Sequence, residues 1–468
     1  MSGDYQYMVD WLGQLGYEPD TRMAGLVAKY RGWDKAENSW SSYSETRNFD
    51  TFKLDRETLN PAAMVAQAWA DLLMNEKLVI SSDNKEMAEV IAEHLRDFGV
   101  SQADFVTDAF ALGTGGWSLG VSRASDDGMI NPDAVISVED HDTQEVMPLT
   151  WSDDDCTQCA FASRVEIDGK DYNRCQAHVL VEGTYHIITQ LFDAKTNAKV
   201  TVESVIPDFD TRSEHPTFAL VRPAIPNTHY DHCAMGVSVF ERGISAVKVT
   251  DEALTSLLTH LRVARPKMFV SETMIKKHTE KNAKGENVTT YSAFGEADDI
   301  VFRMSPGEEH DKPMTVVQPE MRIAENEQAV NAGLKMLSIT CGLGDNYWQW
   351  DHKGGLKTAT EVVSDSSMLA RTLRKHQNAL GKSITRLVRG VAGVCRGVCG
   401  RSVDPEATVT IDFDDSIIVD TQTEKAQMLA EIAAGVVPSW MYLATFYGMN
   451  DEEAKEAVSE GEVIDVGF

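Results

Sequence analysis

Long apolar runs are missing from this chain of 468 residues. The longest stretches, such as 72–80 and 390–398, contain charged residues or glycine, and they fall well below the ~20 apolar residues that a membrane-spanning helix requires. The first residues, MSGDYQYMVDW, have neither the basic region nor the apolar core of a secretory signal peptide. We therefore expect no contact with a membrane, and action in a cytoplasm or in a particle assembled there.

Cysteine and basic residues are also scarce. The seven cysteines have no regular spacing along the chain, which argues against a disulfide framework, and a reducing cytoplasm would keep them as thiols. The 43 Lys and Arg residues are outnumbered by 73 Asp and Glu residues, so the formal net charge is -30. Because binding to nucleic acid relies on cations that displace counterions from phosphates, any contact with DNA must be local or weak.

Two common catalytic and nucleotide-binding motifs, H-E-x-x-H and G-x-x-x-x-G-K-[ST], are absent as well. The glycine-rich stretch 113–120 comes nearest to a dinucleotide-binding loop, but the G-x-G-x-x-G spacing fails at Ser118, which favours a turn that leads into a strand. Acidic clusters at 153–155 and 412–415 need no catalytic explanation in a chain with 73 acids. We expect no enzyme activity and no cofactor; a metal-dependent hydrolase that uses these acids is the weaker alternative.

The strongest metal-binding pattern is Cys156 and Cys159 followed by Cys175 and His178. This spacing resembles a zinc ribbon, in which four such ligands surround the metal. Against zinc, Cys175 and His178 are three residues apart in a predicted strand and so point to opposite faces. A predicted hairpin turn at 168–171 also places Cys175 about four residues from Cys159. We therefore expect no metal, with these four residues as the ligands of the zinc alternative.

The first half of the chain changes from helical to β patterning. Residues 1–130 are predicted to be mostly helical, with one helix that starts at Asn60 and Pro61 and another that runs from Ser101 to Gly113. From 131 to 221, alternation and β-branched residues predict a β-rich unit. Its expected strands are 161–167, 175–191, 200–206 and 218–222.

The second half is dominated by long helices. A helix is predicted from Val237 to just before Pro266, then short strands at 267–322, then a helix over 319–341 that ends at Gly342. A loop with three aromatic residues follows at 342–357, and a T-x-x-E capping box opens a helix over 358–398. Glycines at 381, 390, 393 and 397 predict a kink or a very close contact. A strand pair at 407–420 and short helices at 422–434, 438–447 and 451–459 complete the chain, and lone His260 and His376 are expected on helix surfaces or at interfaces.

Four blocks in this order resemble the portal proteins of long-tailed phages that infect Gram-positive bacteria: LNPAAMVAQAWADLLMNEKLVIS (59–81), GVSVFERGISAVKVTDEALTSLLTHL (236–261), TATEVVSDSSMLARTLRKHQNALGKSITRLV (358–388) and FDDSIIVDTQTEKAQMLAEIAAGVVPSWMYL (413–443). The resemblance implies an α+β portal fold that assembles as a ring, a dodecamer in this family. It implies a wing at 1–235 to which 399–420 return, stem helices at 236–264 and 319–341, a β-containing clip at 265–318, a tunnel loop at 342–357, a long helix at 358–398 and a helical crown at 421–468.

The same resemblance implies a function without catalysis. The ring would be a DNA channel at one capsid vertex of the virion, assembled in the host cytoplasm, for packaging, retention and ejection of the genome. Its partners would be other copies of the chain, double-stranded DNA without sequence preference, the terminase large subunit, a head-completion or adaptor protein, and the major capsid and scaffolding proteins. Another capsid or scaffold-interaction protein, which would lack a ring with an open axis, is the alternative.

Three groups of residues are expected to make these contacts. The tunnel loop would touch DNA through Asn346, Tyr347, Trp348, Gln349, Trp350, Asp351, His352 and Lys353; alternatively its tryptophans pack against the neighbouring subunit. The clip would dock the motor or adaptor through Lys276, Lys277, Lys281 and Lys284. In 357–401, nine Lys and Arg residues stand against two acids. Either Arg371, Arg374, Lys375 and Lys382 present a basic face to DNA or, as we favour, these bases pair with acids of adjacent subunits.

Overall fold

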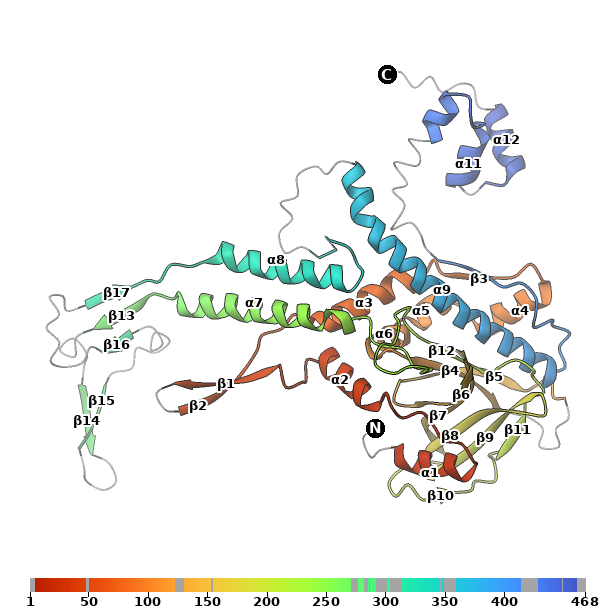
Figure 1. Cartoon of the computed structure of the whole chain (residues 1–468), viewed down its shortest axis with the longest axis horizontal. Coiled ribbons are helices and arrows are strands. Elements are labelled where there is room, and N and C mark those ends of the chain that lie inside the picture. The colour runs from red at the N-terminus through yellow and green to blue at the C-terminus, as the bar shows by residue number, and fades with distance from the viewer. Residues whose placement is uncertain are drawn as a thin grey trace.

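The chain folds into a sheet-containing body, a projecting pair of helices that carries a small β unit, a long helix across the body and a set of short C-terminal helices (Figure 1). This computed structural model describes residues 5–47, 50–122, 130–152, 155–270, 277–281, 285, 287–291, 301–303, 314–345, 347–348, 359–413, 428–447 and 449–460. Among these residues, no helix is both long and apolar enough to span a membrane.

The N-terminal part contains the expected helices, but also a hairpin that the sequence pattern did not reveal. Its elements are α1 (Gln6–Gln14), α2 (Ala24–Asp34), β1 (Ser42–Arg47), β2 (Asp50–Asp55), α3 (Pro61–Leu73), β3 (Val79–Ser81), α4 (Lys85–His94), α5 (Phe98–Ser101) and α6 (Ala103–Leu112). The hairpin strands β1 and β2 pair with each other, and β2 is almost wholly exposed. An exposed hairpin needs no apolar face, so it leaves no alternating hydrophobic signal.

Two helix boundaries in this part are set differently from the sequence prediction. Pro61 begins α3, but the Asn60 side chain does not cap it; the Asn60 amide donates to the Asp34 carbonyl at 2.7 Å instead. Ser101 ends α5 rather than opening α6. The end of α6 is as predicted, because Gly113 adopts the left-handed conformation (φ +94) that closes a helix.

Two antiparallel sheets form the predicted β-rich unit. The larger has the order β10 (Lys199–Val200), β9 (Thr184–Asp193), β8 (Lys170–Val181), β7 (Asp155–Ile167) and β6 (Val146–Ser152), with β11 (Asp208–Asp210) also on β9. The smaller has the order β12 (Phe218–Val221), β4 (Gly115–Ser122) and β5 (Val135–His141). The strand expected over 175–191 is two strands, divided by a turn at Glu182 and Gly183 with positive φ. The strand expected at 200–206 is wrong beyond Val200.

Both faces of the larger sheet are covered. Helix α1 places Met8, Trp11 and Leu12 on one face, where they join the buried side chains of β6, β7 and β8. The other face carries Phe161 and packs with Phe218 of the smaller sheet. The main core then continues through α2, α3, α4, α6 and the long helix.

The projecting helices are α7 (Ile244–Val263) and α8 (Ile323–Thr340). Between them lie β13 (Lys267–Val270), β14 (Lys277–Lys281), β15 (Asn287–Tyr291), β16 (Val301–Arg303) and β17 (Met314–Val317). Strand β13 pairs in parallel with β16 and antiparallel with β17, whereas β14 pairs with β15. Both helices start later than predicted. Residues 237–240 are buried but not helical, and a 3-10 turn at Glu241–Gly243 precedes α7.

The long helix α9 (Ala359–Gly397) has 39 residues and crosses the body. Three of its four glycines mark close contacts, as predicted, although the partner is an extended segment: a methyl group at Gly390, Gly393 or Gly397 would collide with residues 211–216, whereas one at Gly381 would not. Beyond α9, β18 (Thr410–Asp412) pairs with β3; residues 414–420, which hold the rest of the expected strand pair, lie outside the described residues. The C-terminal helices are as predicted in kind, with helical residues 428–433, α11 (Trp440–Tyr447) and α12 (Asp451–Glu460).

Candidate channel and interaction surfaces

The helices α7 and α8 approach each other closely along a small apolar seam. A side chain at Gly333 would meet the Thr250 backbone, with the Thr250 Cα only 2.9 Å from the added carbon. Ala253, Val330 and Leu334 fill the seam around this contact. Elsewhere on the two helices large apolar side chains are exposed, namely Val249, Leu261, Val263, Ile323, Met336 and Ile339. Each of the six is between 36% and 47% exposed in the single chain, which is unusual for so many large apolar side chains on two helices.

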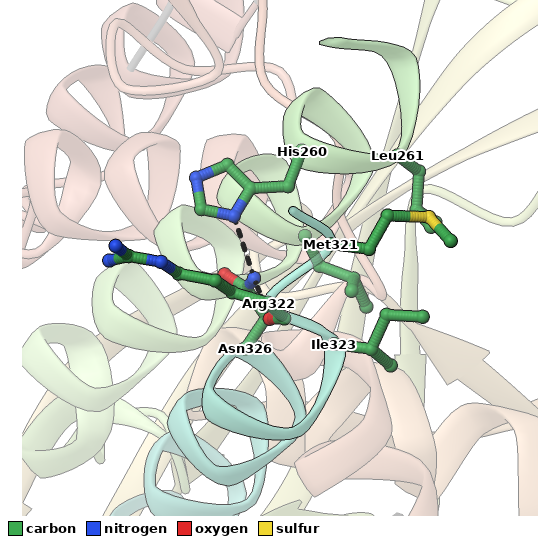
Figure 2. Close-up of a pocket in the computed structure, with 7 residues that line it drawn as sticks. His260, Leu261, Met321, Arg322, Ile323 and Asn326 are labelled. Carbon is green, nitrogen blue, oxygen red and sulfur yellow. Dashed lines mark hydrogen bonds between the residues drawn. The ribbon is translucent and has the colours of Figure 1, made fainter. Parts of the chain in front are cut away.

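A shallow hollow lies between α7 and the start of α8, on the side of the β unit. Figure 2 shows its lining, which consists of Leu257, His260, Leu261, Met321, Arg322, Ile323 and Asn326. The side-chain amide of Asn326 lies 2.8 Å from His260 Nδ1 and links the two helices. His260 is therefore a helix-surface residue, as predicted, with a role in pairing α7 to α8. The hollow is too shallow to enclose a cofactor, and its apolar rim suits a side chain from another protein surface.

Helix α7 is fixed to the body by polar contacts with the segment after the β1–β2 hairpin. The Thr58 hydroxyl donates to Asp251 at 2.7 Å, and Arg262 pairs with Glu57 at 2.6 Å. Asp251 is buried, and this burial raises its carboxyl pKa to about 6. Arg56 lies over the Trp40 ring at 3.8 Å and pairs with Glu252. Hydrophobic periodicity in the sequence did not predict any of these polar contacts.

The end of α8 turns back into the body through a tight glycine motif. Gly342 has φ +84, its N–H donates to Ile339 O, and the Leu343 N–H donates to Ser338 O at 2.8 Å. This pair of bonds is the Schellman pattern, which satisfies the last carbonyls of a helix. The Trp69 indole N–H also donates to Cys341 O at 3.2 Å. The helix therefore ends at Gly342, as predicted, and the chain leaves it from a well-defined position.

Only the beginning of the aromatic loop lies within the described residues. Tyr347 and Trp348 form an edge-to-face pair with ring centres 5.0 Å apart. Trp348 is partly buried against the seam of α7 and α8 and against the main core of its own chain. Trp348 therefore has contacts within its own chain, which neither of the two expectations for the loop included. Asn346, Gln349, Trp350, Asp351, His352 and Lys353 lie outside the described residues.

The predicted basic side chains of α9 gather on one face of the helix. Arg371, Arg374, Lys375 and Lys382 are exposed, and their spacing of three, four and eleven residues places them along a single stripe; we call these four residues the basic face. No acid occurs between Asp365 and Asp404 in the sequence. Among the residues that the structure describes, none of the four forms an ion pair; Arg371 donates to Ser367 O.

Three other bases of this helix region, Arg386, Arg389 and Arg401, have partners within the chain. Arg389 pairs with Glu406 at 3.1 Å, and Arg401 pairs with Glu93 at 2.7 Å. Arg386 contacts Asp155 and the Cys156 carbonyl, donates to Phe218 O at 3.2 Å and lies over the Phe218 ring. Arg386 therefore joins α9 to both sheets. A count of bases could not separate such structural residues from the exposed ones.

His376 is a core residue rather than a surface residue, contrary to the sequence prediction. It lies between the Trp69 and Phe110 rings, with centroids 4.6 and 5.3 Å away. Its Nδ1 accepts from the Ala224 N–H at 3.0 Å. Burial lowers the pKa of the imidazole to about 4, so the ring is neutral at pH 7. The residue is one member of an apolar stripe with Leu369, Leu373 and Leu380.

The candidate zinc residues are divided between the two faces of the larger sheet. Cys159 lies directly opposite His178 on β8, whereas Cys175 lies opposite Ala162, three residues from Cys159 rather than about four. Cys175 joins the core under α1, and Cys156 and Cys159 join the core between the sheets. Within the described parts of the chain, no group of three or more His, Cys, Asp or Glu side chains could hold a metal ion.

The string GWSLG at Gly116–Gly120 fits the G-x-S-x-G pattern of a serine hydrolase, which the sequence reasoning missed. Ser118 Oγ lies 2.8 Å from His141 Nε2, but both side chains are buried. Ser118 sits within strand β4 rather than on a strand-to-helix turn, and His141 Nδ1 faces the Ala162 carbonyl at 3.1 Å instead of a carboxylate. Burial lowers the His141 pKa to about 4. The pair is a hydrogen-bonded link between the two sheets, not a nucleophile with its base.

The lysines expected to dock a motor or adaptor give little further information. Lys277 and Lys281 are the first and last residues of β14. Lys276 and Lys284 lie outside the described residues. The docking role of these four lysines therefore stays a prediction.

The comparison with protein families decides the identity of the chain. Residues 188–465 match the family described as "Phage portal protein, SPP1 Gp6-like", which is more than half of the chain and includes α7, α8, α9 and the C-terminal helices. The chain belongs to this phage portal protein family. The portal protein is a component of a phage particle, which confirms the family resemblance drawn from the four sequence blocks.

Other comparisons add little to the identification of this portal protein. No curated protein matches its sequence. A solved structure described as "Neck of native GTA particle computed with C12 symmetry" is similar over 95% of this chain and 96% of that chain, with 10% identity and a TM-score of 0.35.

Proposed function

We propose that this portal protein forms a closed homo-oligomeric ring, of twelve subunits as the resemblance implies, around a channel for double-stranded DNA. The observation that carries the proposal is the set of large apolar side chains left exposed on α7 and α8. Val263 and Met336, for example, are 47% and 46% exposed. A cyclic ring covers such side chains on every subunit with the next copy of the same chain.

In this proposal each region of a portal subunit corresponds to a defined range of residues. The body formed by 1–235, to which 399–420 return, is the wing, and the pairing of β18 with β3 supports this return. Helices α7 and α8 are the stem (236–264 and 319–341), residues 265–318 are the clip, and 421–468 are the crown. The tunnel loop at 342–357 projects toward the axis, and its segment 349–353 (QWDHK) contacts passing DNA.

An acidic protein suits a conduit through which DNA must slide in both directions. Because each subunit has a net charge of -30, the ring as a whole repels DNA rather than holding it. The clip, with Lys276, Lys277, Lys281 and Lys284, docks the terminase large subunit and later the adaptor protein. ATP hydrolysis then belongs to the terminase. The major capsid and scaffolding proteins contact the wing at the capsid vertex.

The test is electron microscopy of the purified protein viewed down its axis, together with native mass spectrometry. We expect closed rings with an open centre. Met336→Glu should lower the ring population by about tenfold, because it places a charge in a buried interface. Gln328→Glu, on an exposed polar position of the same helix, is the matched control. A wild-type protein that remains monomeric at all concentrations and salts, and in the particle, would refute the proposal.

A further inference from the structure

From the charges on α9 and on the C-terminal helices, we infer that the basic face of α9 binds the acidic C-terminal helices of a neighbouring copy of this chain, not DNA. The inference rests on the ring proposed above, and it assigns a surface within it. It is carried by three observations: the isolation of the basic face, the exposed apolar surface of the C-terminal helices, and the opposite charge of the two.

The basic face lies on the side of α9 that the body does not cover. In Figure 1 the N-terminal end of α9 projects beyond the sheets, whereas its C-terminal part lies across them. In the turns that carry the basic face, Leu373, His376 and Leu380 are buried against the body. On the other side of the same turns, Arg371, Arg374, Lys375 and Lys382 are exposed. Four cations on one stripe repel one another, so the face is stabilised only when anions approach it.

The C-terminal helices lack cover of their own. Seven of the eight residues of α11 are apolar or aromatic, yet none of the eight is buried. Tyr447 and Val436 are 62% and 73% exposed. Helix α12 contacts α11, and Lys455 lies over the Trp440 ring at 4.5 Å. A helix of this composition is expected to be covered in the assembled protein.

The charges of the two surfaces are complementary. From Thr421 to the C-terminus the chain has nine acids and two lysines. Glu452 and Glu456 lie one turn apart on α12 and are exposed. The same acids would repel a DNA phosphate backbone brought near them. Because the acidic C-terminal helices carry the charge opposite to that of the basic face, protein is favoured over DNA as the ligand of the basic face.

The experiment uses full-length chains with reversed charges. One variant carries Arg371→Glu, Arg374→Glu and Lys375→Glu, and the other carries Glu452→Lys and Glu456→Lys. Each should reduce the ring population by about tenfold at low salt in native mass spectrometry, since like charges then face each other. An equimolar mixture should recover wild-type ring levels, because alternating subunits pair every reversed face with a complementary one. Arg396→Glu, an exposed base near the other end of α9, is the control and should leave the ring intact.

The alternative results each overturn the inference. Recovery only when both sets of substitutions are in one chain would mean that the C-terminal helices bind α9 of their own subunit. A basic-face variant with a normal ring but impaired DNA packaging, unaffected by the Glu452→Lys and Glu456→Lys set, would assign the face to DNA. Wild-type protein that forms no ring would refute the proposed function itself. This outcome is distinguishable from the others, because the wild-type protein is measured before any variant.

Discussion

At the scale of single residues, side-chain volume at a few contacts decides how α9 lies on the body. Gly390 faces the Pro216 carbonyl so closely that an added methyl group would overlap it. Gly381, on the same helix, has only Phe413 and Ile411 atoms at 3.8 and 3.9 Å from such a methyl group. The two glycines look alike in the sequence, and their different surroundings arise only from the tertiary fold.

Gly390→Ala should therefore destabilise the protein by about 1–3 kcal/mol, because the helix must move away from residues 211–216. Gly381→Ala should instead be neutral or stabilising by up to about 1 kcal/mol, since alanine is the better helix former and has room. Urea unfolding followed by circular dichroism at one protein concentration measures both. Equal effects of the two substitutions would contradict the close contact at Gly390.

His376 should make the protein less stable in mild acid. Its pKa is about 4 in the fold against an ordinary value of 6.5. As the pH falls from 6.5 to 4, the unfolded chain binds a proton that the folded chain does not. The free energy of unfolding then decreases by up to about 1.4 kcal/mol per pH unit from this group.

The substitution His376→Asn keeps an acceptor for the Ala224 N–H and removes the titration. It should lower stability at pH 7 but flatten the pH dependence between 6.5 and 4. Glu145 and Asp251, whose raised pKa values of about 7 and about 6 act in the opposite direction, are common to both proteins and cancel in the comparison. Unfolding curves at several pH values test this, and parallel curves for the two proteins would show that His376 is not the cause.

At the scale of elements, strong periodicity made the helices predictable, and weak or exposed patterns did not. The segments around α7, α8 and α9 were predicted because each has a long apolar stripe and a recognisable end such as Gly342. The β1–β2 hairpin was missed because its side chains are exposed. The partner of β18 was also missed, since strand pairing over a separation of more than three hundred residues leaves no local signal.

Arg386 joins three elements, and its loss should loosen α9 from the sheets. Arg386→Ala should destabilise the protein by about 2–4 kcal/mol, mainly because the Phe218 and Cys156 carbonyls lose a charged donor. The exposed Asp155 carboxylate should contribute little. Arg386→Lys should be intermediate, because an ammonium group cannot reach all of these acceptors in the planar geometry of arginine.

Arg396→Ala is the matched control for this change, since Arg396 is an exposed arginine on the same helix. It should change the free energy of unfolding by no more than about 0.5 kcal/mol. Thermal and urea unfolding compare the three variants. If Arg386→Ala were as mild as Arg396→Ala, the contacts of Arg386 would be incidental to the attachment of α9.

At the scale of the whole molecule, one aromatic residue of the predicted loop is anchored within its own chain, and the proposed DNA contact is assigned to residues 349–353. The aromatic cluster at 347–350 suggested one role for Tyr347, Trp348 and Trp350. In the structure Trp348 packs on the helix seam and the core of its own chain. Sequence patterning could not separate these roles, because a buried and an exposed tryptophan have the same local composition around them.

This division allows the proposed DNA contact to be tested without disturbing the anchor. Replacement of residues 349–353 by Gly-Ser of equal length, with Tyr347 and Trp348 kept, should leave ring formation intact and impair DNA packaging or retention. The reason is that the charged and aromatic side chains proposed to contact DNA are lost, while the contacts of Trp348 with its own chain are kept. Trp348→Ala should instead lower the free energy of unfolding of the subunit. The loss should be smaller than the ~3–5 kcal/mol typical of a fully buried tryptophan, because Trp348 is only partly buried. A Gly-Ser replacement at the exposed turn 195–198 between β9 and β10 is the control and should package normally. Normal packaging and infectivity in the 349–353 variant would remove the loop from the proposed channel function while leaving the ring itself in place.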